Sequence, residues 1–558
     1  MFTESNVTKT FIFILLMAIN HSGFSQLLNQ NKVFTRKDSL RGSLRPEREC
    51  FDVDYYELAL NFDTVNASIS GSNSIYFKVK KMTNIIQLDL EEHIAIDSIL
   101  WQNKVLAFTR EFNAVFVRFP ETLTVNSRNT VTVKYHGQPV IAKRAPWDGG
   151  FVWSKDKEGN AWIAVACEGL GASSWWPCKD HLSDEPDSIK ITCIVPTGLS
   201  AVCNGNLIQE RKVSEKQTAF TWSISYPINT YNITFNIGKY THWRDSLRYS
   251  DGDILRLDYY VMPYNLEFSK KQFEQVKPML LCYEKYLGKY PFMRDGYALV
   301  ETPYLGMEHQ GAIAYGNKYQ TGYAGKDFSK IGLDFDYIII HETGHEWWGN
   351  SVSCRDIADM WIHEGFCTYT EAIYVECMFG KAKAKEYINA KRSSVRNKAP
   401  IQGSYGVNEE GDGDMYNKGM LMLNTVRNIV GDDELWWQII KGISDTAFKM
   451  KVTDADEIIS YFNKKSGQNL SAVFSQYLKY PKLPTLVYSL KRKGKNCKLT
   501  YSWETDVANF QMPVFVYVQK KLHRLDGNNK KLTKSFSCET IDDIQIATDL
   551  MFVDTKKL

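Results

Sequence analysis

The sequence predicts a multidomain α+β protein with an N-terminal β-domain, a mainly α-helical middle domain and a C-terminal β-sandwich. Three observations support this fold class. A chain of 558 residues is too long for one hydrophobic core. Apolar residues alternate with period two from about Cys50 to Tyr240 and recur at helical spacing beyond Pro263. After Pro484 the period of two returns, which indicates strands again.

The first residues have the layout of a secretory signal peptide. Lys9 precedes an apolar run over residues 11–19, and the small-x-small pattern Gly23, Phe24, Ser25 follows. The run is too short to span a membrane. We therefore expect a signal peptide over residues 1–25 and an exported protein, periplasmic or secreted, without stable membrane insertion after cleavage. An uncleaved anchor is the alternative.

Residues 26–46 are predicted to be a linker, and residues 47–246 the N-terminal β-domain. Its strands are separated by turns rich in Gly, Asn and Asp. The apolar positions that alternate with period two include Tyr56, Leu58, Leu60 and Phe62 in one strand and Leu123, Val125, Val131, Val133 and Tyr135 in later ones.

Residues 247–480 are predicted to form the helical middle domain. Helical periodicity covers four segments: Leu266–Tyr290, Ile331–Asn350, Glu371–Arg392 and Lys418–Lys449. Residues 398–414, between the last two, are rich in Gly and acidic residues and indicate an exposed loop. They lack the spacing of an EF-hand calcium loop.

Residues 481–558 are predicted to form the β-sandwich. Valines at 514, 516 and 518 alternate with Phe515 and Tyr517, and an Asp526-Gly527 turn follows. The net charge of +3 is small, and the basic residues around Gly494 indicate a solvated hairpin turn. We expect no nucleic-acid binding.

Eleven cysteines spread over the chain do not make the dense disulfide framework of a small secreted domain. Two pairs lie within single predicted domains and are candidates for bridges between neighbouring strands: Cys193 with Cys203, and Cys497 with Cys538. Three more cysteines lie near the histidine motif described below: Cys354, Cys367 and Cys377. They lack CxxC spacing, and we expect them to fill the core as small apolar residues.

Two histidines and two glutamates form the most informative motif. His341 and His345 lie four residues apart, so on a helix both imidazoles can bind one cation. Glu342 stands beside them and can act on water. Zinc in hydrolytic sites takes three protein ligands and keeps a fourth position open. Glu364, after eighteen intervening residues, is the candidate third ligand.

These residues belong to a larger set of motifs that resembles the aminopeptidase N family of zinc metallopeptidases. The set comprises HETGHEWWGN at 341–350, WIHEGF at 361–366, LGMEH at 305–309, YNKG at 416–419, and Cys167-Glu168 followed by Pro177-Cys178. The motifs occur in the order of the family and cover most of the mature chain. The resemblance implies a thermolysin-like catalytic domain and one Zn²⁺ per chain.

The resemblance also implies roles for further residues. Glu342 would be the general base, and Tyr416 would donate to the oxyanion of the transition state. Glu308 and Glu168 would bind the free α-ammonium group of the substrate. Gly306 and Met307, in the same motif as Glu308, would line the substrate site. Glu371, seven residues after Glu364, would accept a hydrogen bond from a ligating histidine and so hold that ring in place.

Four residues depart from the pattern of the family: Leu305 replaces a glycine, His309 and His363 each replace an asparagine, and Gly344 replaces a residue that favours helix. None removes a metal ligand or the base. Leu305 and His309 affect the expected shape of the substrate pocket.

The sequence thus predicts a zinc aminopeptidase that removes the N-terminal residue from peptides with a free N-terminus. A zinc endopeptidase or an epoxide hydrolase of the same fold is one alternative. An inactive relative that binds peptides is the other, although such a protein has no chemical need for all five of His341, Glu342, His345, Glu364 and Tyr416.

Overall fold

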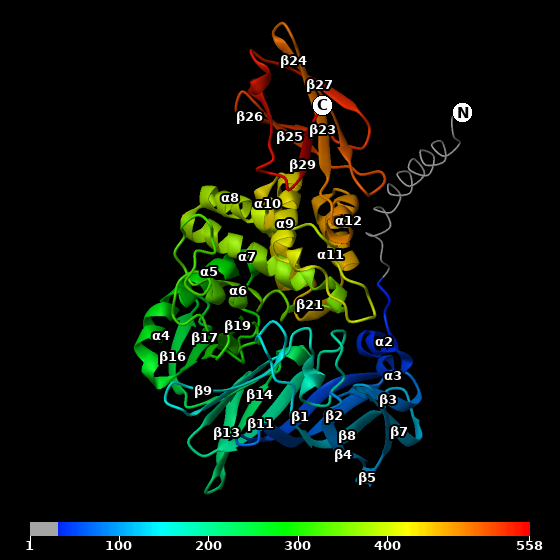
Figure 1. The fold of residues 1–558 in the computed structure, drawn as a ribbon, viewed down its shortest axis with the longest axis vertical. Helices are drawn as coiled ribbons and strands as arrows, with labels where there is room; N and C mark the ends of the chain where they lie inside the picture. Colours follow the sequence, from blue (N-terminus) through cyan, green and yellow to red (C-terminus); the bar gives the residue numbers. More distant parts are fainter. Residues whose placement is uncertain (1–31) are drawn as a thin grey trace, which may run out of the picture.

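The computed structural model describes residues 32–558, so the predicted signal peptide lies outside the described residues. Three regions follow one another along the molecule: a β-rich N-terminal region, a helical middle region and a second β-rich region at the C-terminal end (Figure 1). This order agrees with the predicted fold class. No helix within residues 32–558 has the length and apolarity needed to cross a membrane.

The N-terminal region contains three sheets. The largest has the strand order β13 (Asn206–Ser214), β14 (Gln217–Ile224), β11 (Ser188–Pro196), β1 (Phe51–Asp63), β2 (Ser68–Val79), β8 (Arg128–Gly137), β4 (Ile94–Trp101), β5 (Lys104–Val105). The second is β12 (Ser200–Cys203), β15 (Phe235–Gly238), β10 (Ala161–Ala166), β9 (Gly150–Lys155). The third is β3 (Thr83–Asp89), β7 (Ala114–Leu123), β6 (Ala107–Glu111).

The alternating residues form the core of this region, as predicted. In β1 the apolar face from Tyr56 to Phe62 is buried, and in β8 Val131, Val133 and Tyr135 are fully buried. Val125 is an exception, because it lies in the turn after β7 and is exposed.

Part of the segment predicted as a linker forms two short helices, α2 (Arg36–Gly42) and α3 (Pro46–Glu49). Thr35 caps α2 in a capping box with Asp38. Leu40 is buried against the N-terminal region, and Arg41 forms an ion pair with Asp180 at 2.9 Å. These contacts fix the helix to the N-terminal region.

The middle region begins with a mixed sheet of order β16 (Thr241–Arg248), β17 (Ile254–Val261), β18 (Tyr297–Glu301), β20 (Ile313–Tyr315), β19 (Gly306–Met307). Strands β17, β18 and β20 are parallel, and β19 is an antiparallel edge strand. Two short strands, β21 (Val352–Cys354) and β22 (Lys451–Thr453), pair separately. The helices are α4 (Leu266–Gln272), α5 (Val276–Leu287), α6 (Tyr337–Gly344), α7 (Trp361–Phe379), α8 (Lys381–Ala390), α9 (Asn417–Val430), α10 (Asp433–Gly442), α11 (Ala455–Ser466) and α12 (Ser471–Lys479).

The helices are shorter and more numerous than the periodicity predicts. The segment expected as one helix from Ile331 to Asn350 contains only α6, because Asp336 caps its first turn by accepting from the backbone N–H groups of Ile338 and Ile339. Gly380 and Gly431 have positive φ and end α7 and α9. Helices α11 and α12 lie beyond the predicted helical segments.

The C-terminal region has two sheets, and its hairpin turn at Gly494 is where the sequence places it. One sheet has the order β27 (Leu532–Ser537), β24 (Asn496–Glu504), β23 (Thr485–Lys493), β29 (Asp554–Lys557). The other has the order β26 (Lys521–Leu525), β25 (Val514–Val518), β28 (Ile544–Ile546).

The cysteine predictions have a mixed outcome. Cys497 and Cys538 form a disulfide, as expected. Cys193 and Cys203 face each other with their sulfurs 3.6 Å apart and are not bonded, so that prediction is wrong. Cys377 is not a core filler, because it forms a disulfide with Cys282, 95 residues earlier, and so links α5 to α7. Cys354 and Cys367 are free and buried, as expected.

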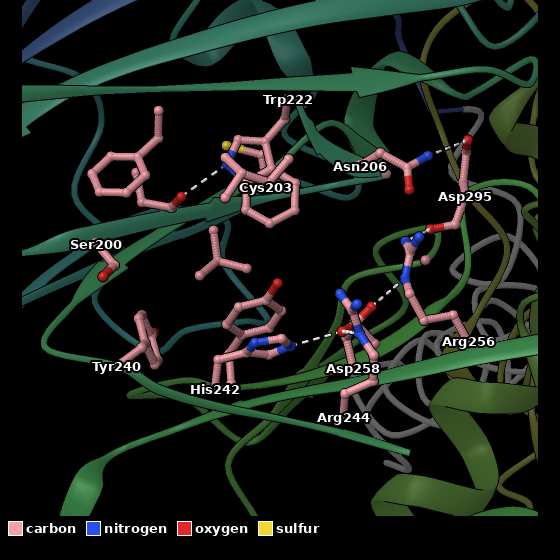
Figure 2. Close-up of a pocket in the computed structure, with 18 of the residues that line it drawn as sticks. Ser200, Cys203, Asn206, Trp222, Tyr240, His242, Arg244, Arg256, Asp258 and Asp295 are labelled. Atoms are coloured by element: carbon pink, nitrogen blue, oxygen red, sulfur yellow. Dashed lines mark hydrogen bonds and ion pairs between the residues drawn. The ribbon is translucent and has the colours of Figure 1, made fainter. Parts of the chain in front are cut away.

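The N-terminal and middle regions meet around an interdomain hollow of about 380 Å³, lined by residues of β12–β14 and β16–β18 (Figure 2). Asp258 stands at its centre and is only 4% exposed. It accepts from His242 at 2.7 Å, from Arg244 at 2.8 Å and from the Nε of Arg256. The charges in this hollow are therefore largely paired with one another.

Candidate active site

The three predicted metal ligands converge at the end of α6 and the start of α7. His341 lies in α6, His345 is its C-terminal cap, and Glu364 lies in the first turn of α7. The Nε2 atoms of the two histidines are 3.3 Å apart, and the Oε2 atom of Glu364 lies 3.5 Å from His341 and 3.4 Å from His345.

This triangle of atoms fits zinc. Its centre lies about 2 Å from each corner, which is the length of Zn–N and Zn–O bonds. The Oε2 atom of Glu364 is buried and accepts no hydrogen bond from residues 32–558, so it has an acceptor position free for a cation. Cys367 also lies near both histidines, but its thiol donates to the backbone oxygen of His341 at 2.9 Å and does not line the cleft.

The outer nitrogens of both histidines have partners that turn the inner nitrogens toward this point. The Nδ1 of His341 lies 2.8 Å from Oε1 of Glu371, and the Nδ1 of His345 lies 2.9 Å from the backbone oxygen of Trp348. Tyr337 and Tyr387 both donate to Glu371 and hold its carboxylate in place. Glu371 thus contacts the outer nitrogen of His341, and no motif in the sequence pointed to Tyr387 or to the carbonyl of Trp348.

A cleft of about 700 Å³ opens over these atoms, and Glu342 lines it. The pKa of Glu342 is raised to about 7, chiefly by burial; the imidazoles of His341 and His345 oppose this shift, and the charges of Glu308 and Glu364 add to it. A carboxyl group with this pKa can take up and release a proton at neutral pH.

Gly306 faces the side chain of Glu342. A Cβ at residue 306 would lie 2.6 Å from Oε1 of Glu342 and 2.8 Å from a methyl group of Ile338, so only glycine fits here. Met307 follows it in edge strand β19, and both residues line the cleft.

Glu308 and Glu168 also line the cleft, close to the candidate metal ligands. Carboxylate oxygens of Glu168, Glu308 and Glu364 lie within 4.8 Å of one another. Tyr231 donates to Glu308 at 3.1 Å, but Oε1 of Glu168 is buried and has no partner among the described residues. Burial raises the pKa of both Glu168 and Glu308. Clustered carboxylates of this kind favour the binding of a cation.

Tyr416 lies immediately before α9, and its ring stacks over His341 with the ring centres 6.0 Å apart. Two glycines bring α9 this close to α7: a Cβ on Gly419 would lie 2.7 Å from the Cα of Gly365. Burial raises the pKa of Tyr416 well above its usual value, so the hydroxyl keeps its proton and can donate.

The four departures from the pattern of the family have different surroundings. Leu305 lines the cleft, whereas His309 is fully buried away from it and neither ring nitrogen has a partner among the described residues. His363 is buried and accepts from the backbone N–H of Cys354 at 2.8 Å. Gly344 makes room for Cys367, whose sulfur would lie 2.9 Å from a Cβ there. Of the four, Leu305 alone lines the cleft.

Comparisons with known proteins agree with this geometry. The chain matches the Peptidase family M1 domain over residues 271–477 and the Peptidase M1 N-terminal domain over residues 52–232. It is 26% identical to tricorn protease-interacting factor F2 of Thermoplasma acidophilum over 67% of this chain and 48% of that protein. It is 23% identical to probable aminopeptidase 2 of Sulfurisphaera tokodaii over 89% of this chain and 62% of that protein. It is 21% identical to leucyl aminopeptidase of Saccharolobus solfataricus over 85% of this chain and 60% of that protein.

Among solved structures, an M1 zinc metallopeptidase from Deinococcus radiodurans bound to a Tyr-Ser-Ala substrate has a TM-score of 0.65 and 19% identity, and the match covers 80% of this chain and 98% of that one. The chain spans between 48% and 62% of the length of the three relatives above. Since both family models match in the expected order, the chain belongs to the M1 family of peptidases.

Proposed function

We propose that this protein is a zinc aminopeptidase that removes the N-terminal residue from peptides. One observation carries the proposal: the carboxylates of Glu168 and Glu308 lie within 4.8 Å of the carboxylate of Glu364, the candidate zinc ligand. A positively charged group bound by the first two would stand next to the metal site. The α-ammonium group of a peptide is such a cation, and its scissile bond is only one residue away.

His341, His345 and Glu364 would hold one zinc ion per chain. When bound, zinc supplies Lewis-acid chemistry that polarises a carbonyl oxygen and acidifies water. Glu342 takes a proton from the attacking water and returns it to the leaving amine. The hydroxyl of Tyr416 donates to the oxygen on which negative charge develops. Glu308 and Glu168 hold the α-ammonium group and so place the first peptide bond over the metal ligands.

The alternatives receive less support from these contacts. An epoxide hydrolase has no need for two carboxylates that bind a cation, and an endopeptidase would have to accommodate more peptide where they stand. An inactive relative would not need a buried Glu342 held against Gly306, nor a Tyr416 held over His341.

Hydrolysis of aminoacyl-arylamides with free and with acetylated N-termini tests the proposal. We expect turnover of the free substrates, little turnover of the acetylated ones, loss of activity with a chelator and its return with zinc. Equal turnover of both substrate types would contradict recognition of the amine. Turnover that is unaffected by metal removal would contradict the zinc site.

We also propose the finer features of the fold and export. The parallel strands and helices α6 and α7 around the metal ligands support a thermolysin-like domain, and the two C-terminal sheets support a β-sandwich. Two disulfides favour an oxidising compartment, in line with the predicted signal peptide. Edman sequencing of protein from the periplasm or medium should begin at Gln26, and an intact Met1 there would contradict cleavage after Ser25.

A further inference from the structure

The active-site cleft is acidic. No lysine or arginine is among the described residues that line it. Its carboxylates are those of Asp148, Glu168, Glu308, Glu342, Glu364 and Glu410. Four of the six have roles in the proposed function. Asp148 accepts from the backbone N–H groups of Lys143 and Arg144. Glu410 has no role so far.

Glu410 faces the cleft without a partner. Its side chain forms no hydrogen bond or ion pair with residues 32–558, whereas its neighbour Glu409 pairs with Lys32. Burial raises the pKa of Glu410, and the charge of Glu364 raises it further. The charge of Glu410 in turn raises the pKa of Glu168. Glu410 thus shares the cleft with Glu364 and Glu168, and a cation bound there would lower the repulsion among these carboxylates.

The backbone around Glu410 is fixed by close packing. A Cβ on Gly411 would lie 1.9 Å from the backbone oxygen of Ile401, and a Cβ on Gly403 would lie 2.0 Å from that of Glu409. The N–H of Asp412 donates to the backbone oxygen of Pro400 at 2.8 Å. Close packing therefore fixes the backbone on either side of Glu410, while its carboxylate, which lines the cleft, stays exposed and can meet a ligand.

We propose that Glu410 is a specificity-determining residue that selects substrates whose N-terminal residue has a basic side chain, lysine or arginine. The inference rests on the proposed function, because it assigns the α-ammonium group to Glu168 and Glu308. A second positive charge on the same residue then meets Glu410. Acidic N-terminal residues are repelled.

Arginyl-, lysyl-, leucyl- and glutamyl-arylamides separate charge selection from general activity. We expect the wild type to prefer arginine and lysine over leucine. Glu410→Gln should lower kcat/KM for the arginyl substrate by about 10- to 100-fold, the range for a hydrogen bond to a charged group, and leave the leucyl value within about twofold. Glu409→Gln is the matched control, because it removes a neighbouring carboxylate outside the cleft and should leave the ratio of the two values unchanged.

An equal loss on both substrates in Glu410→Gln, or an unchanged ratio, would overturn the inference while leaving the aminopeptidase proposal intact. Calorimetry with L-argininamide and L-leucinamide asks the same question without turnover. A selective loss of argininamide binding in Glu410→Gln supports charge selection even if no arylamide is cleaved, in which case only the proposed reaction fails. Equal binding of the two amides by the wild type would refute selection.

Discussion

The active-site cleft and the interdomain hollow both contain charged side chains, but these charges are paired in the hollow and, among the described residues, largely unpaired in the cleft. In the hollow, the side chains of His242, Arg244 and Arg256 surround one carboxylate, Asp258. In the cleft, carboxylates lie beside one another, and among residues 32–558 no lysine or arginine lines it. A buried charge without a partner lowers stability. The difference shows that the hollow pairs its buried carboxylate within one pair of strands, β16 and β17, whereas in the proposed function the cleft keeps its carboxylates for a metal and a cationic ligand.

Replacing Glu342 should give the largest effect. Glu342→Gln removes the base and should lower kcat by roughly 10² to 10⁴. Because it also removes one of several neighbouring carboxylates, thermal unfolding should show a Tm equal to or above that of the wild type. Zinc content, measured by atomic absorption, should match the wild type. A variant that keeps a tenth of the activity would contradict the role of Glu342.

Tyr416→Phe should lower kcat by roughly 10² to 10³, because one donor to the oxyanion is lost while the ring remains over His341. KM should change little, because the carbonyl oxygen of the bound substrate carries less negative charge than it does in the transition state. Tyr517→Phe, in the C-terminal region, removes a hydroxyl that donates to Asp549 and is the matched control. If both variants retain wild-type kcat, Tyr416 has no part in the reaction.

The sequence predicts the parts of the cleft that depend on local spacing. His341 and His345 had to share one side of a helix, and the resemblance supplied Glu364, Tyr416 and Glu371. The sequence did not predict contacts between distant segments of the chain. Tyr387 reaches Glu371 from another helix, and the disulfide of Cys282 spans 95 residues to Cys377.

The errors in the helix predictions have a similar cause. Periodicity reports which residues are apolar, but it does not report where a cap stops the helix. The apolar pattern begins at Ile331, whereas α6 begins at Tyr337, six residues later, directly after its cap Asp336. A cap signal was available for the missed helix α11, where Asp454 accepts from the backbone N–H of Glu457, three residues on.

Gly419→Ala tests how precisely the cleft must be built. Alanine in place of a helical glycine ordinarily stabilises by about 1 kcal/mol. Here the added methyl would meet the backbone of Gly365, so we expect destabilisation of about 1–3 kcal/mol and, since Tyr416 moves with α9, a roughly tenfold fall in kcat. Gly365→Ala, whose Cβ contact is longer at 3.3 Å, should have the smaller effect. A stabilised, fully active Gly419→Ala would show that the helices can separate freely.

Asp258→Ala should have the smallest effect on catalysis and so gives the sharpest contrast between the two sites. Removing the shared acceptor leaves the side chains of His242, Arg244 and Arg256 without it, and urea denaturation should show a loss of about 2 kcal/mol in the free energy of unfolding. The loss stays below that for a fully buried pair, because the Arg244 side chain is 58% exposed and its charge can reach water. For the same reason Arg244→Ala should cost less than about 1 kcal/mol. Arylamide turnover should stay within about twofold of the wild type. A large loss of turnover at unchanged stability would place the hollow in the reaction and end the division between a site whose charges are paired within the protein and a site that binds substrate.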